Sequence, residues 1–341
     1  MLNNLLQINN KYEIFKLFNP NDNTKLTEIK NDDLLELIIL IDDINIELRN
    51  SLGFSKDITF GFEIEFEQTN TQKVKTLINK FFPNSDWKCD YDDSLLDGVE
   101  IISPILNDTN STWRDLKNVC QIGKENGKVS QNSGAHVHVG AHIFNAQKDS
   151  FLNFIKLWSI YENIIFRFSY GEFLTPRMSI NKYAEPVSFN MYELYKNILN
   201  VKTDTDLLYN LPKTRNHAVS FQNTNNLTIF EEKNTIEFRC PNGTLEPAIW
   251  QNNANLFISL LKYSIDGNFN DDIVEKRRRI LDFECQPSLK IYDDIYFEQA
   301  LELCDLIFKR NIDKIYFLRQ YLKSLDPITK KFEKAKKFVL M

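Results

Sequence analysis

Three short segments of this chain alternate apolar residues with acids, histidines or arginine, and this alternation limits how the chain can fold. They are FGFEIEFE at 60–67, GAHVHVGAH at 134–142 and TIEFR at 235–239. Successive side chains of a β-strand point to opposite faces, so each segment predicts a strand with one buried face and one ionisable face. Three such strands in one sheet would share an ionisable face built from Glu63, Glu65, Glu67, His136, His138, His142, Glu237 and Arg239.

The remaining patterns indicate what surrounds these strands. Apolar spacing, caps and prolines predict helices at 31–50, 71–82, 111–127, 148–168 and 191–200, further strands at 86–91, 98–103 and 217–223, and helices throughout 247–341. The helix at 111–127 should begin at a Ser/Thr cap and end at a glycine. This order predicts an α+β fold with a mainly antiparallel, curved sheet and helices packed on one face. We expect a mostly helical extension at 1–55, a central domain at 56–260, and a helical segment at 261–341 packed on it.

Charge and composition exclude several classes of function. The formal net charge of -6 argues against general nucleic-acid binding, which needs a basic surface. No apolar run approaches the roughly 20 residues that span a bilayer, and the first residues lack the features of a signal peptide. The five cysteines show no paired short spacing, which indicates reduced thiols. We therefore expect a cytoplasmic protein with neither nucleic-acid nor membrane partners.

The first alternating segment has two interpretations. A solvated outer face is the commoner use of such alternation in an antiparallel strand. However, carboxylates on one strand face repel one another unless cations neutralise them. Glu63 and Glu65 would be about 6.5–7 Å apart along the strand, a separation that suits two neighbouring metal ions better than one.

The histidine segment favours the metal interpretation. The chain has 4 histidines, and three of them fall in this segment. A lone buried histidine is usually a structural hydrogen-bonding group, but two imidazoles on one strand face beside small residues suit metal or phosphate contact. The small residues are Gly134, Ala135, Gly140 and Ala141. Carboxylates mixed with one or two imidazoles favour Mg²⁺ or Mn²⁺ over a structural zinc ion.

Two further groups of residues add candidates. Residues 90–104 predict a tight hairpin, in which Ser94 lies in the turn and Glu100 is an acid set into an apolar strand. Glu237 and Arg239 share one strand face, either as a simple ion pair or with the arginine placed for bidentate contact with a carboxylate or phosphate. Beside metal ions, that arginine could stabilise charge on a transferred phosphoryl group.

These segments, in this order, resemble motifs of the amidoligase family, a branch of the glutamine synthetase and glutamate–cysteine ligase superfamily of carboxylate–amine ligases. The shared motifs are an acid-x-acid strand, an acid after a glycine, a Gly-x-His-x-His segment and an acid-x-Arg strand. In this chain they are Glu63–Glu65, Gly98–Glu100, Asn132–His138 and Glu237–Arg239, with Arg215 and Asn216 before the last as in the amidoligase branch. The glycine–histidine segment is one residue shorter here, and the glutamine synthetase segment that holds ammonium has no clear counterpart.

The resemblance, which covers about residues 58–260, implies a catalytic domain like that of glutamine synthetase. It also implies ATP-dependent ligation of a carboxylate to an amine through an acyl phosphate, with two divalent ions. By this likeness the metal ligands would be Glu63, Glu65, Glu100, His136 and Glu237, and the nucleotide contacts would come from His138, Arg239, Ser94, Arg215 and Asn216. The catalytic residues would be Arg239, His138 beside the phosphates, and Glu67 as a base for the amine.

Other interpretations stay open. The same histidines and acids could serve a metal-dependent hydrolase, which needs no nucleotide, or a binding protein on a degenerate ligase fold. Arg177 lies in a predicted loop and is a weak candidate for substrate contact. The Lys-rich stretch at 328–338 is typical of a solvated terminal helix. The carboxylate and the amine could each belong to a small molecule, a peptide or a protein, and a homo-oligomer is an open expectation.

Overall fold

The structure is a computed structural model that describes residues 19–42, 44–145, 147–187, 200–211, 213–224, 234–272 and 295–323. Within these residues the fold is α+β, as predicted. No helix in the described part of the chain is long and apolar enough to cross a membrane. The likeness to glutamine synthetase and the division into three parts stay predictions.

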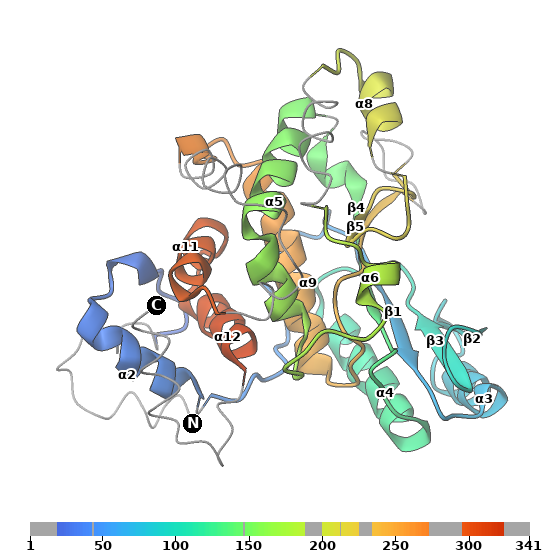
Figure 1. The fold of residues 1–341 in the computed structure, drawn as a ribbon. Helices are drawn as coiled ribbons and strands as arrows, with labels where there is room; N and C mark the ends of the chain where they lie inside the picture. The colour runs from blue at the N-terminus through green and yellow to red at the C-terminus, as the bar shows by residue number, and fades with distance from the viewer. Residues whose placement is uncertain are drawn as a thin grey trace.

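One six-stranded sheet organises the fold (Figure 1). Its strands are β1 (Phe60–Phe66), β2 (Lys88–Asp92), β3 (Gly98–Ile102), β4 (Ala135–Gly140), β5 (Val219–Ser220) and β6 (Thr235–Phe238). They lie in the order β2-β3-β1-β4-β6-β5, and every neighbouring pair is antiparallel. The three alternating segments form β1, β4 and β6, which are consecutive neighbours, so their ionisable faces adjoin.

Helices lie before, between and after the strands along the chain. Those in the described residues are η2 (Leu26–Glu28), α2 (Asn31–Asp42), α3 (Thr71–Phe81), α4 (Asn110–Asn126), η3 (Ala141–Phe144), α5 (Lys148–Ser169), α6 (Ile180–Tyr183), α8 (Asp204–Asn210), α9 (Pro247–Ser264), α11 (Phe297–Ile307) and α12 (Asn311–Leu322). Figure 1 shows α5 and α9 between the sheet and the outer group formed by α2, α11 and α12. Contacts of α12 with α5, α9 and α2 join these layers.

The apolar face of the sheet forms the core against α4, α5 and α9. The ring centroid of Phe62 on β1 lies 6.3 Å from that of Trp113 on α4 and 5.1 Å from that of Trp250 on α9. Phe238 on β6 stacks on Phe257 of α9, with 4.2 Å between centroids. All five side chains are buried. Burial of one such aromatic side chain stabilises the fold by roughly 1.5–3 kcal/mol, so the apolar half of each alternation sets which face turns inward.

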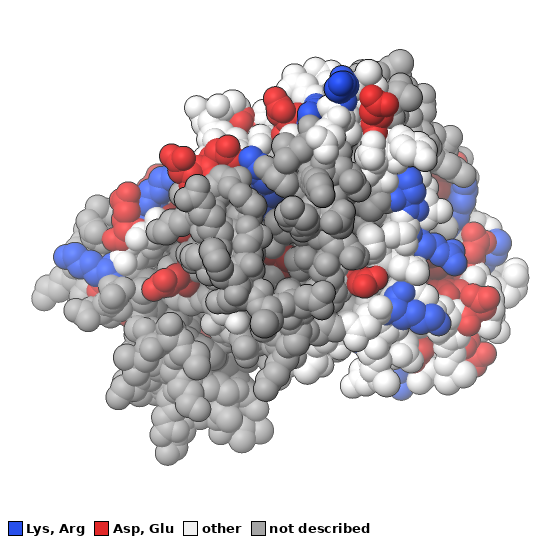
Figure 2. Space-filling view, turned by 45° about the horizontal axis from the view of Figure 1, so that its top comes forward, with Lys and Arg blue, Asp and Glu red and all other residues white. Residues whose placement is uncertain are grey.

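Surface charge on the described residues is mixed. On the face drawn in Figure 2, acidic and basic side chains of these residues lie interspersed rather than gathered by sign. On that face, the coloured residues form no patch of a single sign of charge.

The predicted elements from residue 60 to residue 168 are confirmed, with ends within about two residues of expectation. The cap of α4 is Thr109, whose side chain accepts a hydrogen bond from the Thr112 amide, and the helix closes at Gly127 as predicted. In the region 247–341, α9, α11 and α12 confirm helices, while 273–294 and 324–341 lie outside the described residues. The predicted helix at 191–200 also lies outside the described residues for nearly its whole length.

The helix predicted at 31–50 is too long, because α2 ends at Asp42. Gln251 of α9 accepts a hydrogen bond from the Arg49 amide and donates one to the Arg49 carbonyl, both at 2.8 Å. These bonds satisfy backbone groups that a longer helix would have paired internally. A contact 202 positions away therefore overrides the local helical pattern.

The strand predicted at 217–223 is also shorter than expected, since β5 covers only Val219–Ser220. The Thr224 amide donates to the Phe221 carbonyl at 3.0 Å, and this turn interrupts the regular strand pairing. The Thr235 amide of β6 still donates to the Asn223 carbonyl at 3.3 Å.

Candidate active site

Strand register brings the ionisable positions of four strands into one cluster. Glu63 on β1 lies opposite His136 on β4, and Glu65 on β1 lies opposite Glu100 on β3. His138 on β4 lies opposite Glu237 on β6. Directly opposed side chains in an antiparallel pair have Cβ atoms roughly 4.5–5.5 Å apart, so these six side chains are neighbours across the strands.

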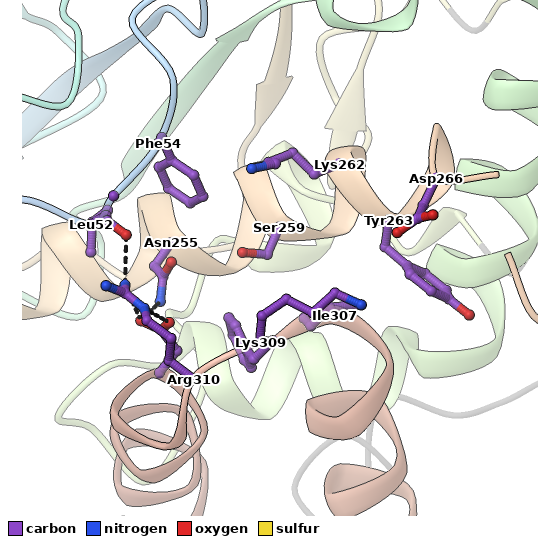
Figure 3. A pocket seen from close by; sticks show the side chains of 13 residues that line it. Leu52, Phe54, Asn255, Ser259, Lys262, Tyr263, Asp266, Ile307, Lys309 and Arg310 are labelled. Carbon is purple, nitrogen blue, oxygen red and sulfur yellow. Dashed lines mark hydrogen bonds and ion pairs between the residues drawn. The ribbon is translucent and has the colours of Figure 1, made fainter. Parts of the chain in front are cut away.

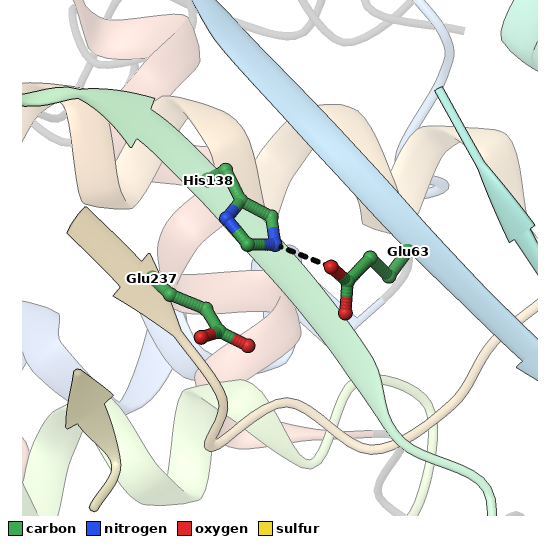
Figure 4. A group of neighbouring side chains, drawn as sticks. All are labelled: Glu63, His138 and Glu237. Carbon is green, nitrogen blue, oxygen red and sulfur yellow. Dashed lines mark hydrogen bonds and ion pairs between the residues drawn. The ribbon is translucent and has the colours of Figure 1, made fainter. Parts of the chain in front are cut away.

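Glu63 is the centre of this cluster. Its Oε2 lies 2.6 Å from Nδ1 of His136, and its Oε1 lies 2.9 Å from Nε2 of His138. The other nitrogen of His138, Nδ1, hydrogen-bonds with the Thr235 hydroxyl at 3.2 Å. Figure 4 shows the carboxylates of Glu63 and Glu237 reaching from β1 and β6 toward the space beside His138. One carboxylate thus holds two imidazoles.

The arginine of the acid-x-Arg strand pairs with its own acid. Arg239 Nη1 donates to Glu237 Oε1, and Arg239 Nε donates to the Tyr183 carbonyl of α6 at 3.2 Å. Glu237 Oε1 also lies 3.6 Å from Nδ1 of His136. The guanidinium therefore borders the cluster, and α6 sets its orientation.

Glu65 extends the cluster toward the start of β4. Its Oε1 lies 3.4 Å from Nε2 of His136, and its Oε2 accepts a hydrogen bond from the Gly134 amide at 2.5 Å. His136 is buried, and its Nε2 has no hydrogen-bond partner among the described residues. A buried imidazole nitrogen without a hydrogen bond therefore lies beside the Glu65 carboxylate, a combination that a metal ion could bridge.

The electrostatics of the cluster reflect its excess of acids. Burial alone would raise the pKa of Glu63, but attraction to His138 and hydrogen bonds with both imidazoles hold that pKa well below its ordinary value. Burial would lower the pKa of His138, yet Glu63 raises it above the usual range. Burial and repulsion from Glu63 and Glu65 raise the pKa of Glu100 to about 9. One glutamate thus keeps its charge while another is forced to hold a proton.

Two groups of these residues have donor atoms placed for a metal ion. The first is Glu63, His138 and Glu237, and the second is Glu63, Glu100 and His136, with donor atoms within 4.8 Å of one another in each group. Both groups share Glu63. The sequence-predicted ligands Glu63, Glu100, His136 and Glu237 are all included, Glu65 borders them, and His138 joins them as a further candidate ligand.

Two residues predicted for the site, Glu67 and Ser94, have no described contact with the cluster. Glu67 is buried, and its Oε2 accepts a hydrogen bond from the Leu96 amide at 3.3 Å. Ser94 lies in the exposed turn between β2 and β3, where its amide donates to Asp92 Oδ1 at 2.8 Å. Their assigned roles stay predictions, with no described contact to the carboxylates of the cluster.

Arg215 and Asn216 are likewise apart from the cluster. Both are exposed in a turn before β5, and the Asn216 carbonyl accepts a hydrogen bond from the Glu185 amide at 2.6 Å. His142 was expected on the ionisable face, but it lies beyond the end of β4 in η3. Its Nε2 hydrogen-bonds with the Asp57 carbonyl at 2.8 Å.

Two residues that matter to the site were weak or absent in the sequence reasoning. Arg177 was a weak candidate, yet it is 3% exposed and its side chain lies over Gly134 on the ionisable face. Asn242, in the turn after β6, was not singled out. Its side chain accepts from the Arg177 amide at 2.9 Å and donates to the Thr175 carbonyl at 2.9 Å. A buried asparagine in a Pro-Asn-Gly turn was the available signal.

A cavity of about 310 Å³ opens beside one end of the cluster. Glu63 and His138 form one part of its lining, and Gly61, Pro104 and Ile105 form another. Gly61 adds no side chain to this space. The cavity therefore gives a ligand access to the Glu63 side of the cluster.

A larger cavity, of about 430 Å³, lies elsewhere, between α9 and the connection of α11 to α12 (Figure 3). Its most buried charges pair with each other: Arg310 donates to Asp313 at 2.9 Å and to the Leu52 carbonyl at 2.6 Å. Asn255 donates to the same aspartate at 2.9 Å. These groups already have partners, so the chemistry belongs to the smaller cavity.

Comparison with known families identifies one match. The model of the family described as "putative amidoligase enzyme" matches residues 84–261, just over half of the 341-residue chain. The matched region contains β3, β4 and β6, with Glu100, His136, His138 and the acid-x-Arg strand. It begins after β1, although β1 lies between β3 and β4 in the sheet. A search of curated proteins found no match.

Proposed function

Because the chain belongs to the amidoligase family, we propose that it is an ATP-dependent ligase that joins a carboxylate to an amine with the help of two divalent ions. The observation that carries this proposal is the pair of overlapping donor groups that share Glu63. A shared carboxylate between two sets of donors is suited to a pair of neighbouring cations. The family match supports the ligase class, and the donor groups support the finer mechanism.

The donors fit hard divalent cations. Carboxylate oxygens dominate both groups, with one imidazole in each, and this combination suits Mg²⁺ or Mn²⁺. The raised pKa of Glu100, caused by burial and by the neighbouring acids, indicates negative charge that a cation would offset. The residues that would hold the ions are Glu63, Glu100, His136, His138 and Glu237, with Glu65 beside them. Bound there, the ions would neutralise phosphate charge and polarise the transferring phosphoryl group.

We place the nucleotide in the cavity beside Glu63 and His138. Its volume of about 310 Å³ lies at the low end of the range for small-molecule sites. Apolar contacts from Pro104 and Ile105 could cover a purine, and the phosphates would then point along the sheet toward the cluster. This placement agrees with the proposed position of His138 next to the phosphates.

The proposed reaction has two steps. The substrate carboxylate attacks the γ-phosphorus of ATP, which forms an acyl phosphate and releases ADP, and an amine then displaces phosphate to form the amide. Arg239 lies beside Glu237 and can donate to the transferring phosphoryl group, where electrostatic stabilisation and positioning supply most of the catalysis. Glu67 remains the proposed base for the amine, at the end of β1 away from the nucleotide.

The test is ATP binding measured by calorimetry with and without Mg²⁺, which needs no knowledge of the acid or the amine. We expect Mg²⁺-dependent binding that weakens at least tenfold in Glu237→Ala, because a ligand of the cation is lost. Glu125→Ala removes the same charge from an exposed position on α4 and should bind like the wild type. Absence of ATP binding by folded, Mg²⁺-treated wild type would refute the proposal and favour the hydrolase.

A further inference from the structure

The loop between α5 and α6 carries one cation into the ionisable face. Arg177 lies in this loop, and its backbone amide is held by Asn242 at 2.9 Å. Asn242 also donates to the Tyr170 and Thr175 carbonyls, at 3.4 and 2.9 Å, so one buried side chain fastens both ends of the segment before Arg177. The arginine itself is 3% exposed. The backbone anchor and the burial of the side chain therefore fix the position of Arg177.

The guanidinium occupies the space that a side chain at Gly134 would fill. A Cβ atom on Gly134 would lie 1.8 Å from Arg177 Nη1 and 3.1 Å from Glu65 Oε2. Gly134 precedes β4 by one residue and shares a face with His136, so the guanidinium lies over the ionisable face next to Glu65. Any residue larger than glycine would displace it.

Most of the hydrogen-bond donors of Arg177 are unused. Nη2 donates to the Arg239 carbonyl at 2.9 Å. Nε is buried without a hydrogen-bond partner, and within the described residues Nη1 makes no hydrogen bond either. Arg177 forms no ion pair with a described carboxylate, Glu65 included. A buried arginine that only balanced the acids would be paired with one of them, because an unpaired buried charge is costly.

The free donors lie at the opposite end of the cluster from the nucleotide cavity. That cavity adjoins Gly61 and His138, whereas Arg177 adjoins Glu65 and Gly134. Gly61 and Glu65 are four residues apart, as are His138 and Gly134, so the two ends are separated by about 13 Å along the strands. Nη2 uses one of its two hydrogens, and its remaining N–H is parallel to an N–H of the unbonded Nε or Nη1, so the guanidinium keeps one edge with two parallel donors. Such an edge matches a carboxylate, which accepts two parallel hydrogen bonds.

We propose that Arg177 binds the reacting carboxylate of the acid substrate. The acid then lies at the Gly134 end of the cluster and the nucleotide at the Gly61 end, with the candidate cation ligands between them. The identity of the ligand as the acid substrate rests on the proposed ligase function. The binding of a carboxylate by Arg177 can be tested separately.

The test uses trifluoroacetate, a small carboxylate followed by ¹⁹F NMR, added to the Mg²⁺-treated protein. Binding should saturate in the wild type and weaken at least tenfold in Arg177→Ala, with partial retention in Arg177→Lys, since a charge-assisted bidentate contact is lost in the first and reduced in the second. Gly134→Ala should weaken binding as well, because it displaces the guanidinium without removing it. Lys182→Ala, an exposed cation on α6, is the matched control and should bind like the wild type.

Calorimetry with Mg²⁺ and ATP separates this inference from the ligase proposal. Arg177→Ala should bind ATP within about twofold of the wild type, which also shows that the variant is folded. Equal trifluoroacetate binding by wild type and Arg177→Ala, or no binding by the wild type, would overturn the role of Arg177. Arg177-dependent trifluoroacetate binding in a protein that does not bind ATP would keep the anion site and refute the ligase.

Discussion

Cation binding to this site should depend steeply on pH, because Glu100 must lose a proton to act as a ligand. Burial and repulsion from Glu63 and Glu65 raise the pKa of Glu100 to about 9 in the protein without bound ions. Below that pKa the carboxyl group of Glu100 is protonated, and a divalent ion has to displace the proton in order to bind. Raising the pH toward 9 therefore strengthens binding.

The size of the effect on cation affinity follows from the difference between the pKa of Glu100 and the pH of the assay. At pH 7, about 1% of Glu100 is ionised, so the apparent cation affinity is lower by up to about 100-fold, or about 3 kcal/mol, than with Glu100 fully ionised. The apparent association constant for Mg²⁺ should rise about tenfold per pH unit between roughly pH 6.5 and 8. About one proton should be released for each ion bound at Glu100.

Calorimetry of Mg²⁺ binding in two buffers of different ionisation enthalpy counts the released protons. Glu100→Gln keeps the side-chain shape but cannot titrate, so both the proton release and the pH dependence from this group should vanish. Glu67→Gln is the matched control, because Glu67 is a buried acid directly after β1 and outside both donor groups, and it should keep both effects. If the wild type released no proton at pH 7, or if Glu100→Gln kept the same slope, the reasoning about this cluster would be wrong.

Three further predictions concern stability. Without metal, Glu100→Gln should raise the Tm at pH 8, since an acid whose folded pKa lies above its unfolded value destabilises the fold increasingly as pH rises between the two; an unchanged or lower Tm would contradict this. Asn242→Ala should lower the free energy of unfolding in urea by about 2–3 kcal/mol because buried partners lose their hydrogen bonds, whereas exposed Gln222→Ala should change it by less than about 0.5 kcal/mol. Phe238→Ala should lower the free energy of unfolding by about 3–5 kcal/mol, because it leaves a cavity under the cluster. Phe81→Ala is the control, since Phe81 is 58% exposed and its loss should cost much less. Comparable losses in the two variants would contradict a packed core around Phe238.

Much of the candidate site could be predicted from alternation alone. Glu63, His136 and Glu237 stand on strands whose other face is apolar, and burial of that face leaves the ionisable residues little choice of direction. The same periodicity placed Glu100 on a strand after the hairpin. What alternation could not reveal is adjacency, because the neighbours of a strand are chosen by contacts between distant segments.

Failures of the sequence reasoning have the same origin. The helical pattern at 31–50 ends early because Gln251 pairs with backbone groups near its end. Ser94 and Arg215 occur near motif residues in the sequence, yet they lie in exposed turns without a described contact to the cluster.

The sequence by itself determined which residues form strands and which faces of them carry charge, because strand periodicity and apolar burial are properties of short segments. Tertiary structure alone decided that β1 lies between β3 and β4, which makes Glu63 the centre of both donor groups. It also decided that Arg177 reaches Gly134, across 43 positions of chain, because Asn242 holds the intervening loop and glycine leaves room for the guanidinium. Such contacts depend on how separate segments pack together, and no local pattern encodes them.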